Sequence, residues 1–157
     1  MNISNPNNGF VSSVWGPSAW FFIHCVALNF PLNPTRQEKL TYRRWFESLG
    51  TVLPCGACKR NFKSNLISAN YDTKTDFESR MQFYQLTYRL HNVVRQQQGK
   101  STTLSYQDSV LLYEQFRAQD CTTGKSGEKG SCDAKLPLTC TMVIKNSQDN
   151  ECRLRME

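Results

Sequence analysis

Two cysteines separated by two residues are the strongest candidates for chemistry in this chain. Cys55 and Cys58 stand at the expected start of a helix, where unpaired N–H groups and the helix dipole stabilise a thiolate. Three cations follow and add positive potential: Lys59, Arg60 and Lys63. Because the thiolate is the nucleophile in disulfide exchange, this pair is typical of a redox site.

The same pair can also supply half of a zinc site. The other half would come from the cysteines that follow residue 118: Cys121, Cys132, Cys140 and Cys152. These are scattered, whereas zinc ligands usually come in closely spaced pairs, so we predict no metal site. A thioredoxin-like site is also disfavoured, because its cysteines follow a strand and a helix is expected before Cys55.

Helices are expected to position the cysteine pair and two further clusters, one around His24 and one around His91. A first helix is expected from Pro17 to Phe30, with Trp20 and His24 on one face. Three capping-box patterns predict later helix starts: Thr35-x-x-Glu38, Thr75-x-x-Glu78 and Ser105-x-x-Asp108. A short helix should follow Cys55, with the apolar residues Phe62, Leu66 and Ile67.

The helix expected after Thr75 is long and central. Its apolar stripe contains Phe77, Met81, Tyr84, Tyr88, His91 and Val94. Taken alone, His24 and His91 are explained as core residues. No segment before residue 118 alternates with a period of two, so the sequence predicts an all-α fold. We expect a four-helix bundle with a short fifth helix, plus a cysteine-bearing irregular C-terminal tail.

The length of 157 residues suits one domain with flanking segments. Residues 1–13 are rich in Asn and Ser and are expected to be a loose leader. Residues 14–118 form the helical domain. Residues 119–157 form a cysteine-rich extension, in which residues 136–144 are compatible with a short strand.

The charge of the chain is unevenly distributed. Residues 1–35 carry no charged side chain, yet the apolar run 14–30 contains polar residues and is shorter than a membrane span. No basic leader of a signal peptide precedes it. The net charge is +6, but no arm dense in Arg and Lys is present. We therefore expect no membrane span and no nucleic-acid partner.

Three motifs together resemble those of the Erv/ALR-type FAD-linked sulfhydryl oxidases, particularly the short viral members. The motifs are Trp-Gly-x-x-x-Trp-x-x-x-His ending at His24, Pro-Cys-x-x-Cys-x-x-x-Phe starting at Pro54, and His-Asn-x-Val starting at His91. The resemblance runs from Trp15 to Phe116. It implies a helical, FAD-dependent thiol oxidase that passes electrons from substrate dithiols to O2, giving H2O2.

The resemblance also implies roles for matching residues. Cys55 and Cys58 would be catalytic, with Cys58 beside the isoalloxazine ring and Cys55 more exposed. The residues expected to bind FAD are Gly16, Trp20, His24, Cys58, His91, Asn92, Val94 and Lys100. The chain departs from the family pattern at Arg95, where Asn is usual, and at Asn29, where an aromatic residue is common.

The four later cysteines have two interpretations. The spacings 121–132 and 140–152 suit two structural disulfides, although four cysteines allow three pairings. The resemblance implies the alternative of a shuttle that passes electrons to Cys55, but the closely paired motif of such shuttles is missing. The remaining Cys25 is expected to be a thiol buried in the core.

The resemblance implies partners and a location. A protein thiol, or a thioredoxin-like or shuttle dithiol, would be the substrate, and two copies of the chain would pair as a homodimer. The short core favours the cytoplasm of a virus-infected cell or the virion, with the mitochondrial intermembrane space as the alternative. The competing function is a non-enzymatic helical interaction module with structural cysteines that could bind zinc.

Overall fold

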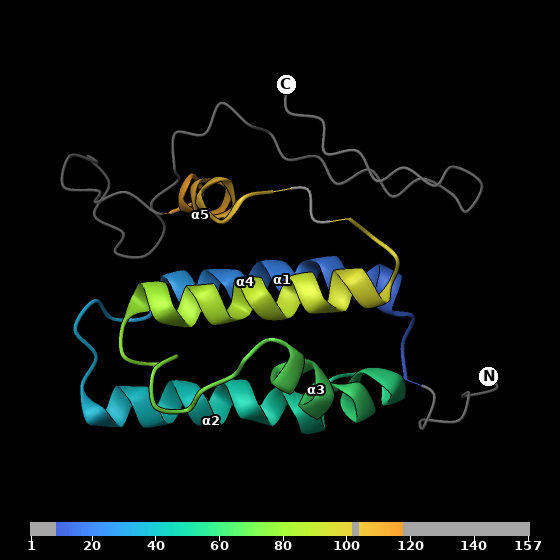
Figure 1. Ribbon diagram of the computed structural model, residues 1–157, viewed down its shortest axis with the longest axis horizontal. Helices are drawn as coiled ribbons and strands as arrows, with labels where there is room; N and C mark the ends of the chain where they lie inside the picture. The colour runs from blue at the N-terminus through green and yellow to red at the C-terminus, as the bar shows by residue number, and fades with distance from the viewer. Residues whose placement is uncertain (1–8, 102–103, 118–157) are drawn as a thin grey trace, which may run out of the picture. The chain divides into compact units, whose positions relative to one another are not determined.

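The computed structural model describes residues 9–101 and 104–117, and every regular element within them is a helix (Figure 1). The helices are α1 (Ser12–Leu28), α2 (Arg36–Val52), α3 (Gly56–Ser68), α4 (Arg80–Gln97) and α5 (Tyr106–Glu114). This confirms the predicted all-α fold with a short fifth helix. The cysteine-bearing tail and the strand predicted at residues 136–144 lie outside the described residues.

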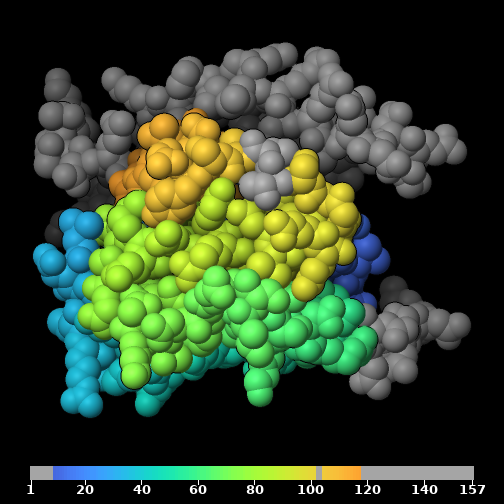
Figure 2. All heavy atoms as spheres, viewed as in Figure 1, coloured from blue at the N-terminus to red at the C-terminus, as the bar shows by residue number. Residues whose placement is uncertain are grey.

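Helix α4 is the centre of the bundle. It lies beside α1 and also contacts α3 and α5, while α2 packs against α3 (Figure 1). In the space-filling view the side chains of α4 lie between those of α5 and those of α3 (Figure 2). At its core the ring of Phe83 lies 5.5 Å from Phe30, 5.7 Å from Phe46 and 4.8 Å from Phe77, centroid to centroid. All four rings are buried.

Helix α2 begins where the capping box predicts. The backbone N–H of Glu38 donates to the Thr35 hydroxyl at 3.2 Å, and the Glu38 carboxylate accepts from the Thr35 N–H at 2.7 Å. The hydrogen bonds that the carboxylate accepts from the N–H and the hydroxyl of Thr35 lower the pKa of Glu38. Helix α5 is capped by Ser105, whose hydroxyl oxygen accepts from the N–H of Asp108. Both predicted starts are therefore confirmed.

The predicted start of the fourth helix at Thr75 is wrong. Helix α4 begins at Arg80, and its N-cap is Ser79, which accepts from the N–H of Gln82. The Ser79-x-x-Gln82 spacing is itself a capping-box pattern, so the sequence offered two starts. The Thr75 hydroxyl instead donates to Asp72, and Glu78 pairs with Lys39 at 2.5 Å. Tertiary and loop contacts thus decide between the two patterns.

Helix α1 begins earlier than the predicted Pro17. Its first residue is Ser12, so Pro17 lies inside the helix, where it has no N–H to donate. The second half of α1 buries Ile23, His24 and Ala27 against the bundle. Within the described residues, no helix is long and apolar enough to cross a membrane.

Polar contacts fix α3 and its following loop to α4. The guanidinium of Arg89 donates to the Asp76 carboxylate at 2.8 Å and to the carbonyl of Ala69 at 2.8 Å. Gln97 donates to the side-chain oxygen of Asn65 at 2.6 Å. Asp76 and Asn65 are buried, where hydrogen bonds to charged or amide partners offset the cost of desolvation. These bonds hold α3 in register with α4.

A glycine allows α3 to pack closely on α2. A Cβ added at Gly50 would lie 2.7 Å from Cδ1 of Phe62, a buried ring of α3. Gly→Ala inside a helix normally stabilises by about 1 kcal/mol, but overpacking costs about 1–3 kcal/mol. We therefore expect Gly50→Ala to give no stabilisation and to lower the free energy of unfolding by up to about 2 kcal/mol, measured by urea denaturation.

Gly16 provides the matched control for this prediction. Apart from its chain neighbours and its own helix, a Cβ added there meets nothing within 4 Å, so Gly16→Ala should cause no loss from overpacking against another helix. A Gly50→Ala variant that is more stable than the unmodified protein by about 1 kcal/mol, the usual gain for Gly→Ala in a helix, would contradict the close packing of Phe62 against α2.

Candidate active site

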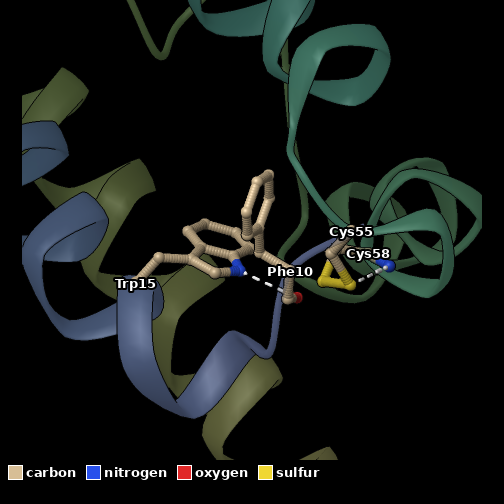
Figure 3. Close-up of a disulfide and its surroundings, with 4 residues drawn as sticks. All are labelled: Phe10, Trp15, Cys55 and Cys58. Atoms are coloured by element: carbon tan, nitrogen blue, oxygen red, sulfur yellow. Dashed lines mark hydrogen bonds between the residues drawn. A yellow bond between two sulfur atoms is a disulfide. The ribbon is translucent and has the colours of Figure 1, made fainter. Parts of the chain in front are cut away.

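The sulfur atoms of Cys55 and Cys58 form a disulfide at the N-terminus of α3 (Figure 3). Their Cα atoms lie 5.2 Å apart. Cys55 is the N-cap, and its Sγ accepts a hydrogen bond from the backbone N–H of Cys58 at 3.1 Å. The first turn of α3 contains no acidic residue, and the exposed cations Lys59 and Arg60 follow. After reduction, this environment stabilises a thiolate.

Two histidines form the polar centre between α1 and α4. Nε2 of His24 lies 3.0 Å from Nδ1 of His91, and Nδ1 of His24 lies 3.1 Å from the hydroxyl of Thr87. That hydroxyl donates to the carbonyl of Tyr84 at 2.8 Å. Because its one proton is used there, the Thr87 oxygen accepts from Nδ1–H of His24.

The same logic determines the tautomers of both rings. When His24 carries its proton on Nδ1, its Nε2 is the acceptor for the Nδ1–H of His91. A neutral His91 then leaves its own Nε2 as a hydrogen-bond acceptor. The chain of donors therefore runs from His91 through His24 and Thr87 to the main chain.

Burial keeps both histidines neutral at pH 7. Desolvation, and secondarily the nearby His91, lower the pKa of His24 to about 3. Desolvation, followed by the charges of Arg95 and Lys100, lowers the pKa of His91 to about 4. A ring that cannot take up a proton at pH 7 serves here as a positioned hydrogen-bonding group.

Aromatic faces surround the histidine pair. The ring of Trp20 stacks on that of His91, with centroids 4.2 Å apart and planes 8° from parallel. The ring of His24 lies 4.7 Å from Tyr113 on α5 and 5.4 Å from Tyr84. This arrangement offers flat, apolar surfaces next to a few hydrogen-bonding atoms, as sites for planar ring systems do.

A small cleft of about 70 Å³ opens beside this cluster. Its lining residues are His24, Tyr88, His91, Asn92, Arg95, Leu104, Ser109 and Tyr113. Three predicted site residues therefore meet here: His24, His91 and Asn92. Trp20 joins them through its stack on His91.

The other predicted site residues are not part of this cleft lining. Gly16 lies in the first half of α1, Cys58 in the disulfide, Val94 on α4 and Lys100 just after it. Lys100 is nonetheless close enough to lower the pKa of His91. Two residues of α5, Ser109 and Tyr113, also line the cleft, and no local pattern marks them as site residues because only tertiary packing brings α5 to the histidines.

Arg95, noted as a departure from the family pattern, has a definite role. Its guanidinium donates twice to the carbonyl of Ser101, from Nε at 3.2 Å and from Nη2 at 2.6 Å. It thereby holds the segment after α4 and places a positive charge at the cleft.

The structure describes one of the five remaining cysteines. Cys121, Cys132, Cys140 and Cys152 lie outside the described residues. Cys25, expected in the core, is only half-buried on α1. Within residues 9–101 and 104–117, no group of three or more His, Cys, Asp or Glu side chains is placed to hold a metal ion.

A disulfide at a helix N-terminus, set in a helical bundle with a buried histidine and aromatic cluster, defines a thiol–disulfide redox protein. The model of the Erv1 / Alr family matches residues 17–117. The chain belongs to this family, as its motifs predicted.

Individual relatives agree with this assignment. The chain is 39% identical over 102 residues to a protein of Acanthamoeba polyphaga mimivirus named "Probable FAD-linked sulfhydryl oxidase R368", covering 64% of this chain and 68% of that protein. It is 32% identical over 85 residues to the "FAD-linked sulfhydryl oxidase ERV1" of Oryza sativa, but that match covers 54% of this chain and 42% of the plant protein. The chain thus spans less than half the length of this plant relative.

A solved structure shares the fold. The crystal structure of the yeast Erv1 core superposes with a TM-score of 0.56 at 21% identity, covering 73% of this chain and 90% of that one. The likeness supports the helical architecture described above.

Proposed function

We propose that this protein is an FAD-dependent thiol oxidase that introduces disulfide bonds into protein substrates. The observation that carries the proposal is the Cys55–Cys58 disulfide at the N-terminus of α3. Membership of the Erv1 / Alr family and the names of the relatives support it. They favour an enzyme over the alternative of a helical interaction module with structural cysteines.

The first half of the reaction is thiol–disulfide exchange. A substrate thiolate attacks Sγ of Cys55, a mixed disulfide forms, and the electron pair of the broken bond leaves on Cys58. The second substrate thiolate attacks the substrate sulfur of the mixed disulfide and releases Cys55. The substrate loses two electrons and two protons, and the cysteine pair gains two electrons. The N–H of Cys58 and the dipole of α3 stabilise the thiolates.

Restoring the disulfide requires an acceptor for two electrons. Bound FAD supplies this capacity and the onward transfer to O2, which gives H2O2. We assign Cys58 as the cysteine beside the flavin and Cys55 as its substrate-facing partner. The role of this chain is to position the two sulfurs and to limit access of water and other thiols.

The residues that line the cleft, together with the neighbouring Trp20 and Lys100, fit part of an FAD molecule. Planar faces come from Trp20 and His91, and cations suited to a pyrophosphate come from Arg95 and Lys100. Nε2 of the neutral His91 carries no proton, so it can accept a hydrogen bond from a hydroxyl or amino group of the cofactor. At about 70 Å³ the cleft is smaller than the roughly 300–1,000 Å³ of sites for drug-sized ligands, so it would hold only one portion of the cofactor.

We assign the FAD-binding domain to residues 14–118, in agreement with the family match over residues 17–117. Gly16 and Val94 are proposed as further cofactor contacts on α1 and α4. The tail, residues 119–157, is proposed to carry two structural disulfides.

A homodimer is proposed because α1 leaves Phe22 58% exposed. A mimivirus relative supports the cytoplasm of an infected cell as the location.

An absorption spectrum tests the proposed function. The purified protein should be yellow, and adding dithiothreitol without O2 should bleach the flavin band, because electrons then reach FAD and stop there. Admitting air should restore the colour with release of H2O2. A well-folded, colourless protein that contains stoichiometric zinc would overturn the proposal in favour of the structural module.

A further inference from the structure

A short segment before α1 lies directly against the disulfide (Figure 3). We call this segment, Gly9–Val11, the strap. The backbone N–H of Phe10 donates to the carbonyl of Pro54 at 2.6 Å, and Nε1–H of Trp15 donates to the carbonyl of Phe10 at 3.2 Å. Both backbone polar groups of Phe10 are therefore bound, and its position next to Cys55 is defined.

Only glycine allows the strap to come this close. Gly9 has a φ of +66°, which side chains rarely adopt. A Cβ at this position would also lie 2.8 Å from Cα of Cys55 and would overlap the carbonyl oxygen of Pro54. The contact between the strap and the cysteine loop is thus built into the sequence at Gly9.

Several backbone groups around the disulfide are already hydrogen-bonded within the protein. The N–H of Cys55 donates to Leu53 at 2.8 Å, and the N–H of Cys58 donates to Sγ of Cys55. The carbonyl of Pro54 is occupied by Phe10. These bonds remove three backbone groups near Cys55 from pairing with a reduced polypeptide, so recognition of such a substrate has to draw on side chains as well.

The side chain that the strap offers is a phenylalanine. Phe10 is 74% exposed, the largest exposed fraction of any phenylalanine in the described residues. Its backbone is held on both sides while its ring faces solvent. Such an arrangement does not stabilise the fold by burial, but it provides a positioned apolar surface beside the reactive bond.

We propose that Phe10 is a specificity-determining residue. It contacts an apolar side chain next to the attacking cysteine of the substrate and so favours reduced protein segments of that kind over polar ones. This inference rests on the proposed thiol oxidase function. The exchange step itself is unchanged: the substrate sulfur bonds to Cys55, and the electron pair leaves on Cys58.

Three reduced substrates test the inference on the full-length holoenzyme. Two are peptides with a Cys-Gly-Gly-Cys motif, one with Leu and one with Ser before the first cysteine, and the third is dithiothreitol. Phe10→Ser should lower kcat/KM for the Leu peptide about fivefold to tenfold, the loss expected for one apolar side-chain contact. It should change the other two by less than about twofold.

Two variants on α1 serve as comparisons. Val14→Ser removes a side chain that is 78% exposed but not part of the strap, and it should leave all three substrates unaffected. Trp15→Phe removes the donor to the Phe10 carbonyl while keeping a ring, and it should reduce the preference for the Leu peptide. Bound flavin, read from absorbance, confirms that each variant is folded.

The outcomes separate this inference from the proposed function. An unmodified enzyme that oxidises dithiothreitol but does not prefer the Leu peptide, or a preference that survives Phe10→Ser, would overturn the inference alone. A general rise of kcat/KM in Phe10→Ser would also overturn it, because the strap would then only obstruct Cys55. No oxidation of dithiothreitol by the unmodified enzyme would overturn the function and, with it, the inference.

Discussion

Replacing Cys58 with serine is expected to lower the rate of thiol oxidation at least about 1,000-fold, as is usual when a nucleophile is removed. Serine cannot form the disulfide with Cys55, so the substrate has no bond to reduce. The polar cleft and its aromatic faces are unchanged, and the variant should remain yellow. Oxygen consumption with dithiothreitol measures the rate, and absorbance measures bound flavin.

Cys25→Ser is the matched control for this loss. Cys25 is half-buried on α1, and its thiol has no part in the proposed exchange. This variant should keep most of its activity. Full activity in Cys58→Ser, or equal losses in both variants, would contradict the assignment of the Cys55–Cys58 pair as the redox centre.

Acidification is expected to destabilise the protein through its histidine pair. Histidine in the unfolded chain has a pKa of about 6.5, whereas the folded values are about 3 for His24 and about 4 for His91. Between these values the unfolded chain binds more protons, so the free energy of unfolding falls as the pH is lowered from about 6.5 towards 4.5. The stabilising contribution is fully present above this window.

The expected loss is on the order of 3–5 kcal/mol between pH 7 and pH 4.5, at up to about 1.4 kcal/mol per pH unit for each ring. Urea denaturation at several pH values and constant ionic strength measures it. The chain contains two histidines, and both belong to this pair, so no other imidazole contributes. His91→Gln should remove about half of the slope.

A stability that is constant from pH 6.5 to 5 would contradict the neutral, buried state of both rings. An undiminished slope in His91→Gln would assign the effect to His24 or to carboxyl groups instead. Two described carboxyl groups, Glu38 and Asp72, have a lowered pKa, and their contribution is lost at the acid end of this window and below it. The slope between pH 6.5 and 5 therefore reports mainly on the histidines.

Local sequence patterns predicted much of the fold. The capping boxes at Thr35 and Ser105 and the helical stripe through Phe62 and Leu66 depend on contacts within one helical turn or one helix face. The same reasoning failed at Thr75, where two overlapping cap patterns compete and only the loop contacts of Asp72 decide between them. It also failed at Ile67, which fits the apolar spacing of α3 but is 70% exposed.

The site was likewise only partly predictable. Its residues could be named because their spacing matched three motifs of a family, and the structure places three of them, His24, His91 and Asn92, at one cleft. The roles of Tyr113 and Ser109 could not be seen, since α5 has its own local pattern and nothing in that pattern says which helices it covers. The position of the strap could not be predicted either, for a different reason: the Asn- and Ser-rich segment that contains it has no periodicity to interpret.

The sequence by itself determined the helical class, the redox chemistry and the family, because these depend on residue types and on spacings of a few positions. Only the tertiary structure decided which groups face each other over long separations. It paired His24 with His91, 67 residues later, and it set the strap against Pro54. Both arrangements depend on hydrogen bonds between segments that are far apart in the sequence, and no local pattern encodes such contacts.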